Sequence, residues 1–347
     1  MSSRPFPLTD IARDASKSSD AQWFVPCAIL VACQYLTAVL IGSKIGFLPS
    51  LPTAEYMGIA FVVSLVGASV IVLPKVHGFW REQEKHPLRR LAGEANWKVI
   101  ASYVIGFQLV AWQMGALTWL KDMLPQVIPY WADPALASLD RTILGADAWR
   151  LIPGWLTRPF DIVYVTWAFV ETAVLILVLS LRPSPVKSRA MLAYFLIVGL
   201  MGVCGQYLLS SAGPVFYDQV FGGDRFAGLT ARNGVNAPFV QLGVNMLWSS
   251  YSSHTDQIGN GISAMPSMHV ATTAWVALSL SALSPKLRGP AWAYWLAIFI
   301  GSFVLGWHYF LDGVVATVGA VGCWTLAHRL ITRERNTIRR DKLAAVI

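Results

Sequence analysis

The chain has 347 residues, of which 55% are hydrophobic and only 13% are charged, and its mean hydropathy is +0.51. Soluble domains carry about 25% charged residues, so this composition excludes an ordinary soluble protein and is typical of a membrane protein with several spans. The net charge of +8 also occurs in nucleic-acid-binding proteins. In a membrane protein, however, basic residues report topology and lipid headgroups, so we expect no nucleic acid partner.

The N-terminal residues 1–22 are polar and lack a periodic apolar pattern, which predicts a flexible cytoplasmic tail. A signal peptide is not expected, because the apolar run that follows is long and has no small-residue cleavage site. A spanning helix needs about 20 mostly apolar residues. Eight runs meet this requirement: Phe24–Gly42, Tyr56–Leu73, Val99–Leu120, Phe160–Leu181, Ala190–Leu209, Ser267–Leu283, Ala291–Phe310 and Gly313–Ile331.

These runs predict an all-α, polytopic integral membrane protein with about eight transmembrane helices. The final residues, 332–347, predict a basic cytoplasmic tail. Residues 121–158 are too polar to span but rich in tryptophan. They predict short interfacial helices or, equally, a folded loop that packs on neighbouring helices.

Cysteine chemistry is not expected, because no Cys-x-x-Cys pair or zinc spacing occurs. The four cysteines lie within apolar runs and are interpreted as small core side chains: Cys27, Cys33, Cys204 and Cys323.

The basic residues are distributed unevenly over the two sides of the predicted membrane. Of the 27 Lys and Arg residues, one side holds only Lys44, Lys121, Arg141, Arg150, Arg158, Arg225 and Arg232. The positive-inside rule therefore places both termini in the cytoplasm. It follows that the 210–266 loop, the start of the sixth run and the end of the seventh lie on the extracytoplasmic face, as expected for a bacterial inner-membrane protein.

The stretch Gly259–Val270 is suited to binding phosphate. Proline is favoured at the first position of a helix, so Pro266 is predicted to begin the sixth helix. The amides of Ser267, Met268 and His269 would then face outward at the positive end of the helix dipole.

A second polar stretch lies at the outer end of the seventh run. His308 and Asp312 are four positions apart, which places them on one face of a helix. A carboxylate bonded to one imidazole nitrogen leaves the other as a directed nucleophile, and His269 from the sixth helix is a candidate proton donor. The alternatives are that each histidine is a polar anchor at the membrane interface and that the His–Asp pair is only a structural hydrogen bond.

These two stretches resemble the second and third signature motifs of the type 2 phosphatidic acid phosphatase (PAP2) superfamily, Pro-Ser-Gly-His and Ser-Arg-x5-His-x3-Asp. The resemblance is closest to the inositol phosphorylceramide synthase-like branch and covers roughly 135–330, which makes 135–331 the PAP2-like catalytic membrane domain and leaves 23–134 as N-terminal transmembrane helices. It implies that His308 is the nucleophile that forms a phosphohistidine, Asp312 its orienting carboxylate and His269 the general acid. It also implies that Ser267 holds phosphate oxygens, and that the enzyme needs no metal and no cofactor.

The chain departs from the family pattern in its phosphate-binding positions. Met268 replaces glycine, and Gly301-Ser302 stands where Ser-Arg is usual. The first motif, a lysine, six residues and Arg-Pro, is not present as written, although Arg158 precedes a proline. Other cations on the outer side must then hold the phosphate, and the candidates are Arg225, Arg232, Arg158 and Arg150.

Three further features carry weaker interpretations. The segments Ser211–Tyr217 and Leu139–Gly145 resemble outer segments of the synthase-like branch. Asp161 and Tyr164 resemble the start of one of its helices, although polar groups at the start of any helix would look the same. His254 is interpreted as a solvated loop residue.

The sequence thus predicts a lipid phosphatase or phosphotransferase that acts on a lipid phosphate ester at the outer face of the bilayer. A headgroup transferase like inositol phosphorylceramide synthase is the alternative within the family. A proton-coupled transporter and a metal-dependent hydrolase that uses His269, His308 and Asp312 as ligands are more remote.

Overall fold

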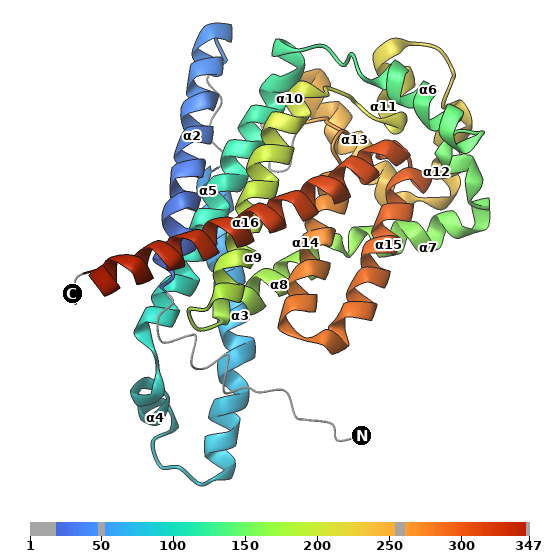
Figure 1. Cartoon of the computed structure of the whole chain (residues 1–347). Helices are drawn as coiled ribbons and strands as arrows, with labels where there is room; N and C mark the ends of the chain where they lie inside the picture. Colours follow the sequence, from blue (N-terminus) through green and yellow to red (C-terminus); the bar gives the residue numbers. More distant parts are fainter. Residues whose placement is uncertain (1–18, 48–52, 254–260, 345–347) are drawn as a thin grey trace, which may run out of the picture.

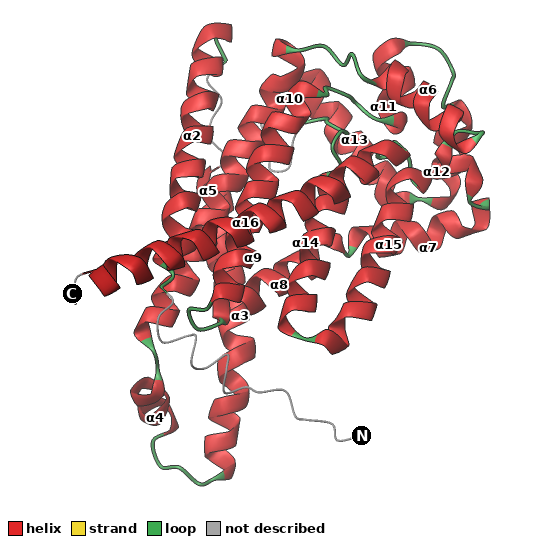
Figure 2. Ribbon diagram, viewed as in Figure 1, coloured by secondary structure: helices red, strands yellow, loops and turns green. Residues whose placement is uncertain are grey.

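The computed structural model describes residues 19–47, 53–253 and 261–344, and within 334–344 only the course of the helix backbone. The structure is 83% helical, and these ranges contain no strand (Figure 2). The all-α prediction is therefore confirmed. Of the predicted N-terminal tail, residues 1–18 lie outside the described part, as does His254.

Within the described residues, six helical segments are long and apolar enough to cross a membrane. They are Ala21–Ile45 (α2), Thr53–Arg81 (α3), Trp97–Val127 (α5), Gly154–Ser180, Pro185–Leu208 and the first part of Phe310–Ala344 (α16). The segment Gly154–Ser180 contains Gly154–Leu156 (η2), Thr157–Val165 (α7) and Trp167–Ser180 (α8). The segment Pro185–Leu208 contains Pro185–Leu196 (α9), a π-helix at Ile197–Gly205 (η3) and Gln206–Leu208 (α10).

The two remaining predicted spans are shorter helices. Met268–Leu283 (α14) has 16 residues and Arg288–Val304 (α15) has 17. A rise of 1.5 Å per residue makes them about 24–26 Å long, slightly less than the roughly 30 Å hydrocarbon core of a bilayer. They are joined by Pro285–Leu287 (η4).

The predicted end of the seventh span at Phe310 is wrong. Helix α15 ends at Val304, and the chain reverses before α16 begins at Phe310. Gly306 makes the reversal possible with a φ of 76°, in the left-handed region where a side chain is strained. A Cβ at this position would also collide with the Leu229 side chain. His308 therefore lies in a tight turn between two helices and not at the end of one.

One end of the bundle is built from short helices (Figure 1). They are Asp133–Leu144 (α6), Ala148–Leu151 (η1), Pro214–Phe221 (α11), Ala227–Asn236 (α12) and Pro238–Ser253 (α13). At the opposite end lie Pro87–Glu94 (α4) and the α14–α15 turn. Residues 121–127 of the 121–158 segment continue the long helix α5, contrary to the prediction, whereas the rest forms short helices, of which α6 packs on α11 and α16 as a folded loop would.

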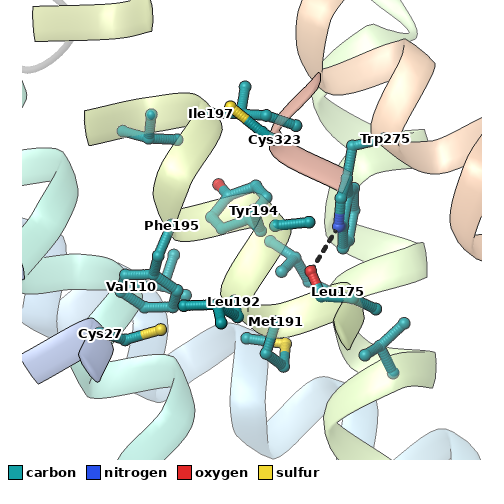
Figure 3. Close-up of a cluster of buried hydrophobic side chains, with 14 of the residues drawn as sticks. Cys27, Val110, Leu175, Met191, Leu192, Tyr194, Phe195, Ile197, Trp275 and Cys323 are labelled. Atoms are coloured by element: carbon teal, nitrogen blue, oxygen red, sulfur yellow. Dashed lines mark hydrogen bonds between the residues drawn. The ribbon is translucent and has the colours of Figure 1, made fainter. Parts of the chain in front are cut away.

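The core lies where α9, α14 and α16 meet α5 (Figure 3). Tyr194 of α9 is buried there against Trp275 of α14, whose indole N–H donates a 2.7 Å hydrogen bond to the Ala190 carbonyl, and Phe195 packs on Trp23 of α2. This packing fixes the helix that carries His269. In contrast, α2 and α3 expose apolar side chains such as Val70, as lipid-facing helices do.

A buried lysine joins the N-terminal helices to α9. Lys187 of α9 is fully buried, and its ammonium donates to Asp20 Oδ2 at 3.1 Å, Ser102 Oγ at 3.0 Å and the Leu181 carbonyl at 3.1 Å. A buried ammonium needs such partners, because it has lost its hydration. The bond therefore connects α5 and the start of α2 with α9.

All four cysteines are free, and they divide into two pairs. Cys27 and Cys323 are buried as predicted, whereas Cys33 and Cys204 are exposed on the outside of the bundle.

Candidate active site

The stretch before α14 is held by Ser267. Helix α14 begins at Met268, so the prediction that Pro266 begins it is wrong by two residues. Ser267 is the N-cap: its side-chain oxygen accepts from the Val270 N–H at 3.3 Å, which satisfies a helix donor that has no partner within the helix. Its own N–H donates to the Asp312 carbonyl at 3.3 Å. Ser267 is fully buried, and its hydroxyl has a structural partner.

His308 is oriented by two backbone carbonyls, one in α15 and one in the stretch before α14. Its N–H donates to the Ser302 carbonyl at 3.1 Å, and its Nδ1 lies 2.7 Å from the Ala264 carbonyl oxygen. A carbonyl only accepts, so we assign the ring hydrogen to Nδ1. Nε2 then carries a lone pair in the neutral ring, as a nucleophile requires.

Asp312 lies close to His308 but is not its nearest partner. Oδ2 of Asp312 is 3.6 Å from His308 Nδ1 and accepts the Tyr309 N–H at 2.8 Å. Asp312 is fully buried, and its Oδ1 has no hydrogen-bond partner in the described residues. The carboxylate thus places a charge beside the imidazole. The orientation of the ring, which was predicted to depend on Asp312, is set by the Ala264 carbonyl.

His269 lies opposite His308. Its Nδ1 is 3.5 Å from His308 Nε2, and its ring packs between Tyr164 at 4.9 Å and Trp167 at 4.3 Å between centroids. Trp167 is fixed in turn by a 2.7 Å hydrogen bond from its indole to Thr272 Oγ1, one turn along α14 from His269. The structure therefore brings together the two histidines and the aspartate that the sequence selected.

Two carboxylates of α6 support the turns around the site, and neither was predicted to do so from the sequence. Asp133 accepts from the Ala212 and Gly213 N–H groups at 2.8 Å and from the Tyr309 hydroxyl at 2.9 Å. Burial raises its pKa to about 6, although these three donors oppose the shift.

Asp140 has the same role at the start of α16. It accepts from the Phe310 N–H at 2.6 Å and the Leu311 N–H at 3.2 Å. Burial raises its pKa to about 6, against the effect of these two donors. One indication of these contacts was present in the sequence. The two segments that resemble the synthase-like branch contain some of the groups involved: Asp140 lies in Leu139–Gly145, and the Ala212 and Gly213 amides lie in Ser211–Tyr217.

Asp161 is not a polar group at the start of its own helix. It is buried, and it accepts from the Phe239 and Val240 N–H groups at 3.1 and 3.0 Å. Asp161 of α7 therefore caps the N-terminus of the neighbouring helix α13, and so fixes one end of the helix that covers the site.

A cavity of about 360 Å³ opens at the two histidines. Its apolar wall includes Val165, Phe239 and Met246, and its polar wall includes Lys121, Gln206 and Ser263. In the described residues Gln206 Oε1 and Ser263 Oγ are buried without hydrogen-bond partners. Unsatisfied buried polar atoms are costly, so these two are available to a polar ligand.

The structure does not bring the predicted arginines to this cavity. Arg232 donates to the Trp149 carbonyl at 2.7 Å and to the Val304 carbonyl, and Arg225 donates to the Ala137 carbonyl at 3.0 Å. Both therefore hold outer loops in place. Arg158 is exposed on α7, and Arg150 lies 3.8 Å from Asp147.

Among the described residues that line the cavity, the one lysine or arginine is Lys121 of α5, which was predicted to lie on the outer side but was not a predicted site residue. The sequence signal for it was weak. Six residues separate Lys121 from Ile128-Pro129, and six separate Gln206 from Gly213-Pro214, so each keeps the first-motif spacing without its arginine. Spacing alone does not distinguish the two positions.

A metal site was a rival interpretation of the same side chains. In the described part of the chain, no group of three or more His, Cys, Asp or Glu residues is arranged to hold a metal ion. The Nδ1 of His308 faces a carbonyl, and Asp312 Oδ2 accepts a backbone N–H. These contacts orient the His308 imidazole and hold the Asp312 carboxylate in place.

Comparison with known families gives a match to part of the chain. The model described as PAP2 superfamily matches residues 141–326, a range that contains His269, His308 and Asp312 but not Lys121. Comparisons with curated proteins and with solved structures gave no match.

Proposed function

The chain belongs to the PAP2 superfamily, and on this premise we propose that it is a membrane-embedded enzyme that cleaves or transfers a lipid phosphate ester. The observation that carries the proposal is the 3.5 Å approach of His308 Nε2 to His269 Nδ1 at the wall of the cavity. One nitrogen is the nucleophile and the other side chain is the proton donor. This arrangement is the minimum that phosphoryl transfer through an enzyme nucleophile requires.

In the proposed reaction the Nε2 lone pair of His308 attacks phosphorus, and the bond between phosphorus and the leaving oxygen breaks. Protonated His269 gives its proton to that oxygen. The phosphoryl group is then bonded to His308. Water or an alcohol next attacks phosphorus and passes its proton to His269, and the phosphorus–nitrogen bond breaks to restore His308.

The buried charge of Asp312 supports the first step. When Nε2 attacks, the imidazole ring becomes positively charged, and a carboxylate 3.6 Å from Nδ1 stabilises that charge. The Ala264 carbonyl keeps the ring in the reactive orientation throughout. Asp312 and Ala264 thus divide between them the two tasks of a catalytic carboxylate.

A lipid substrate is supported by the surface around the cavity. Val165, Phe239 and Met246 line the cavity and are also 42–44% exposed. Phe169, one turn after Val165 on a candidate span, is 74% exposed. The cavity therefore borders an apolar surface, which suits the acyl chains of a lipid and is unfavourable in water.

The proposed orientation has eight spans, with α14 and α15 as the two short ones and both termini in the cytoplasm. The site then lies on the extracytoplasmic face, and in a bacterium the enzyme would be in the inner membrane. The distribution of Lys and Arg supports this orientation.

Transfer to a lipid alcohol, as in the inositol phosphorylceramide synthase-like branch, is the second candidate. A further cavity of about 280 Å³ borders the first and shares Lys121, Gly261 and Ile262 with it. Its wall carries the polar side chains of Asp122 and Gln126. A second compartment beside the reacting groups suits a second substrate, which hydrolysis does not need.

The test uses the full chain purified in detergent, with dioleoyl phosphatidic acid for hydrolysis and phosphatidylinositol with ceramide for transfer. We expect turnover that persists in EDTA, is inhibited by vanadate and is lost in His308→Ala. His328→Ala is the matched control, because His328 lies on α16 far from the turn. Release of free phosphate supports hydrolysis, and label that moves from one lipid to another supports transfer. Full activity in His308→Ala, or activity that requires added metal, would overturn the proposal.

A further inference from the structure

We propose that Lys121 of α5 supplies the positive charge that holds the substrate phosphate, so that the N-terminal helices complete the active site. This inference rests on the proposed function and deepens it. Lys121 lies outside the matched range 141–326, in a helix that the sequence analysis left without a role.

The need for a cation follows from the charge of the substrate. A phosphate ester carries one or two negative charges, and a cavity with apolar walls does not compensate them. Among the residues that line the cavity in the described structure, Lys121 is the one lysine or arginine. The histidines must serve as nucleophile and acid, so neither is a permanent counter-charge.

The competing cations are already engaged. Arg225 lies 3.5 Å from Asp147 and Arg232 is bonded to two backbone carbonyls. Within the described residues, Lys121 is part of no ion pair. A lysine at the wall of a cavity is therefore the group whose charge remains for a ligand.

The position of Lys121 relative to the histidines is fixed by close packing. Gly261 begins the described part of the stretch before α14 and has a φ of 90°. A Cβ added there would lie 2.5 Å from the Lys121 Cβ and 2.9 Å from its carbonyl carbon. The chain that leads to His269 thus lies directly against Lys121, an approach that only glycine permits.

Helix α5 is also fixed from the other side. The Tyr207 hydroxyl donates to the Leu120 carbonyl at 2.6 Å, next to Lys121, and Leu120 is packed in a cluster with Trp119 and Met123. Gln206, the neighbour of Tyr207, lines the same cavity with an unpaired oxygen. Lys121 and Gln206 together therefore present a donor charge and a polar side chain to one ligand.

Purified full-length protein tests the inference through the inhibition of turnover by vanadate and by inorganic phosphate. Lys121→Met keeps the alkyl stem and removes the charge, and we expect both inhibition constants to rise roughly 10- to 100-fold. Lys121→Arg restores the charge and is expected to remain within about threefold of the unchanged protein. Lys44→Met is the matched control, because Lys44 is also an outer lysine of an N-terminal helix but does not line the cavity.

A second measurement needs no variant and so does not depend on the folding of Lys121→Met. Acylation of lysines by a water-soluble ester, read by mass spectrometry, should be slowed at Lys121 by vanadate and unchanged at Lys44. Unchanged inhibition constants in Lys121→Met, or no protection of Lys121, would overturn the inference. If His308→Ala is inactive in the same series, the proposed function stands without Lys121; if it is fully active, the proposed function itself fails.

Discussion

His308 Nε2 and His269 Nδ1 lie 3.5 Å apart, with their rings at 61° to one another. A phosphoryl group does not fit between two nitrogens at this separation, since attack and departure take place on opposite sides of phosphorus. The His269 ring must therefore move aside, or use its other nitrogen, when substrate binds. The packing of His269 between Tyr164 and Trp167 limits that motion to rotation within an aromatic slot.

The first prediction concerns the role of His269 as the acid. His269→Ala should reduce kcat for dioleoyl phosphatidic acid roughly 10²- to 10⁴-fold, because an alkoxide is a poor leaving group without a proton. With 4-nitrophenyl phosphate, whose leaving group needs no proton, the loss should be at least tenfold smaller. His308→Ala should abolish both reactions equally. Equal losses for both substrates in His269→Ala would contradict the assignment.

The second prediction separates Asp312 from the carbonyl that orients His308. Asp312→Asn keeps an acceptor for the Tyr309 N–H and removes the charge beside the imidazole, so kcat should fall roughly 10²-fold or more with little change in KM. Asp224→Asn, an exposed carboxylate in the outer loop, is the control. The measurement is steady-state hydrolysis together with the thermal unfolding midpoint. A variant that retains full kcat would remove Asp312 from the mechanism.

The third prediction is a pH dependence of stability that comes from α6. The pKa values of Asp133 and Asp140 are raised to about 6 by burial, above the ordinary value of 3.8. Between these pH values the folded state keeps protons that the unfolded chain has released. The free energy of unfolding therefore falls as pH rises from about 4 to 6, by at most about 3 kcal/mol for each carboxyl, and is level above that range.

Thermal unfolding in detergent from pH 4.5 to 7.5 tests this dependence. Asp133→Asn and Asp140→Asn remove the titrating group, so each variant should show a smaller fall than the unchanged protein across this range. The slope is the relevant quantity, because each variant also loses an acceptor and is less stable at every pH. A variant slope equal to that of the unchanged protein would show that these carboxyls do not titrate near pH 6.

The sequence predicted those parts of the site that follow from motif spacing and from the order of the apolar runs. The long apolar runs appeared as helices, and the spacing of His308 and Asp312 placed the two side chains together because both lie around one turn. The cation could not be predicted in this way. Lys121 reaches the histidines because α5 packs on η3 and α10, a contact between segments about eighty residues apart in the chain.

The structural role of the predicted arginines could not be recognised from the sequence. Arg225 and Arg232 stood in the outer loop, where a phosphate-binding residue was expected, and nothing in their neighbours marked them as structural. Apart from Asp147, which lies 3.5 Å from Arg225, their partners are carbonyl groups of Ala137, Trp149 and Val304. Backbone carbonyls are present at every position, so the sequence carries no signal for which of them will need a donor. Only the folded loops decide it.

The last prediction follows from this contrast and concerns Arg232. Arg232→Met leaves the carbonyls of Trp149 and Val304 without their donor, and it also loses the stacking of the guanidinium on the Trp149 ring at 4.8 Å. We expect a loss of about 1–3 kcal/mol in the free energy of unfolding, the cost of unsatisfied buried groups. The inhibition constant of vanadate should change less than threefold at a temperature where the variant is folded. Arg158→Met, at an exposed position, should change neither quantity. If Arg232→Met instead weakens vanadate binding tenfold without loss of stability, Arg232 and not Lys121 is the phosphate-binding cation.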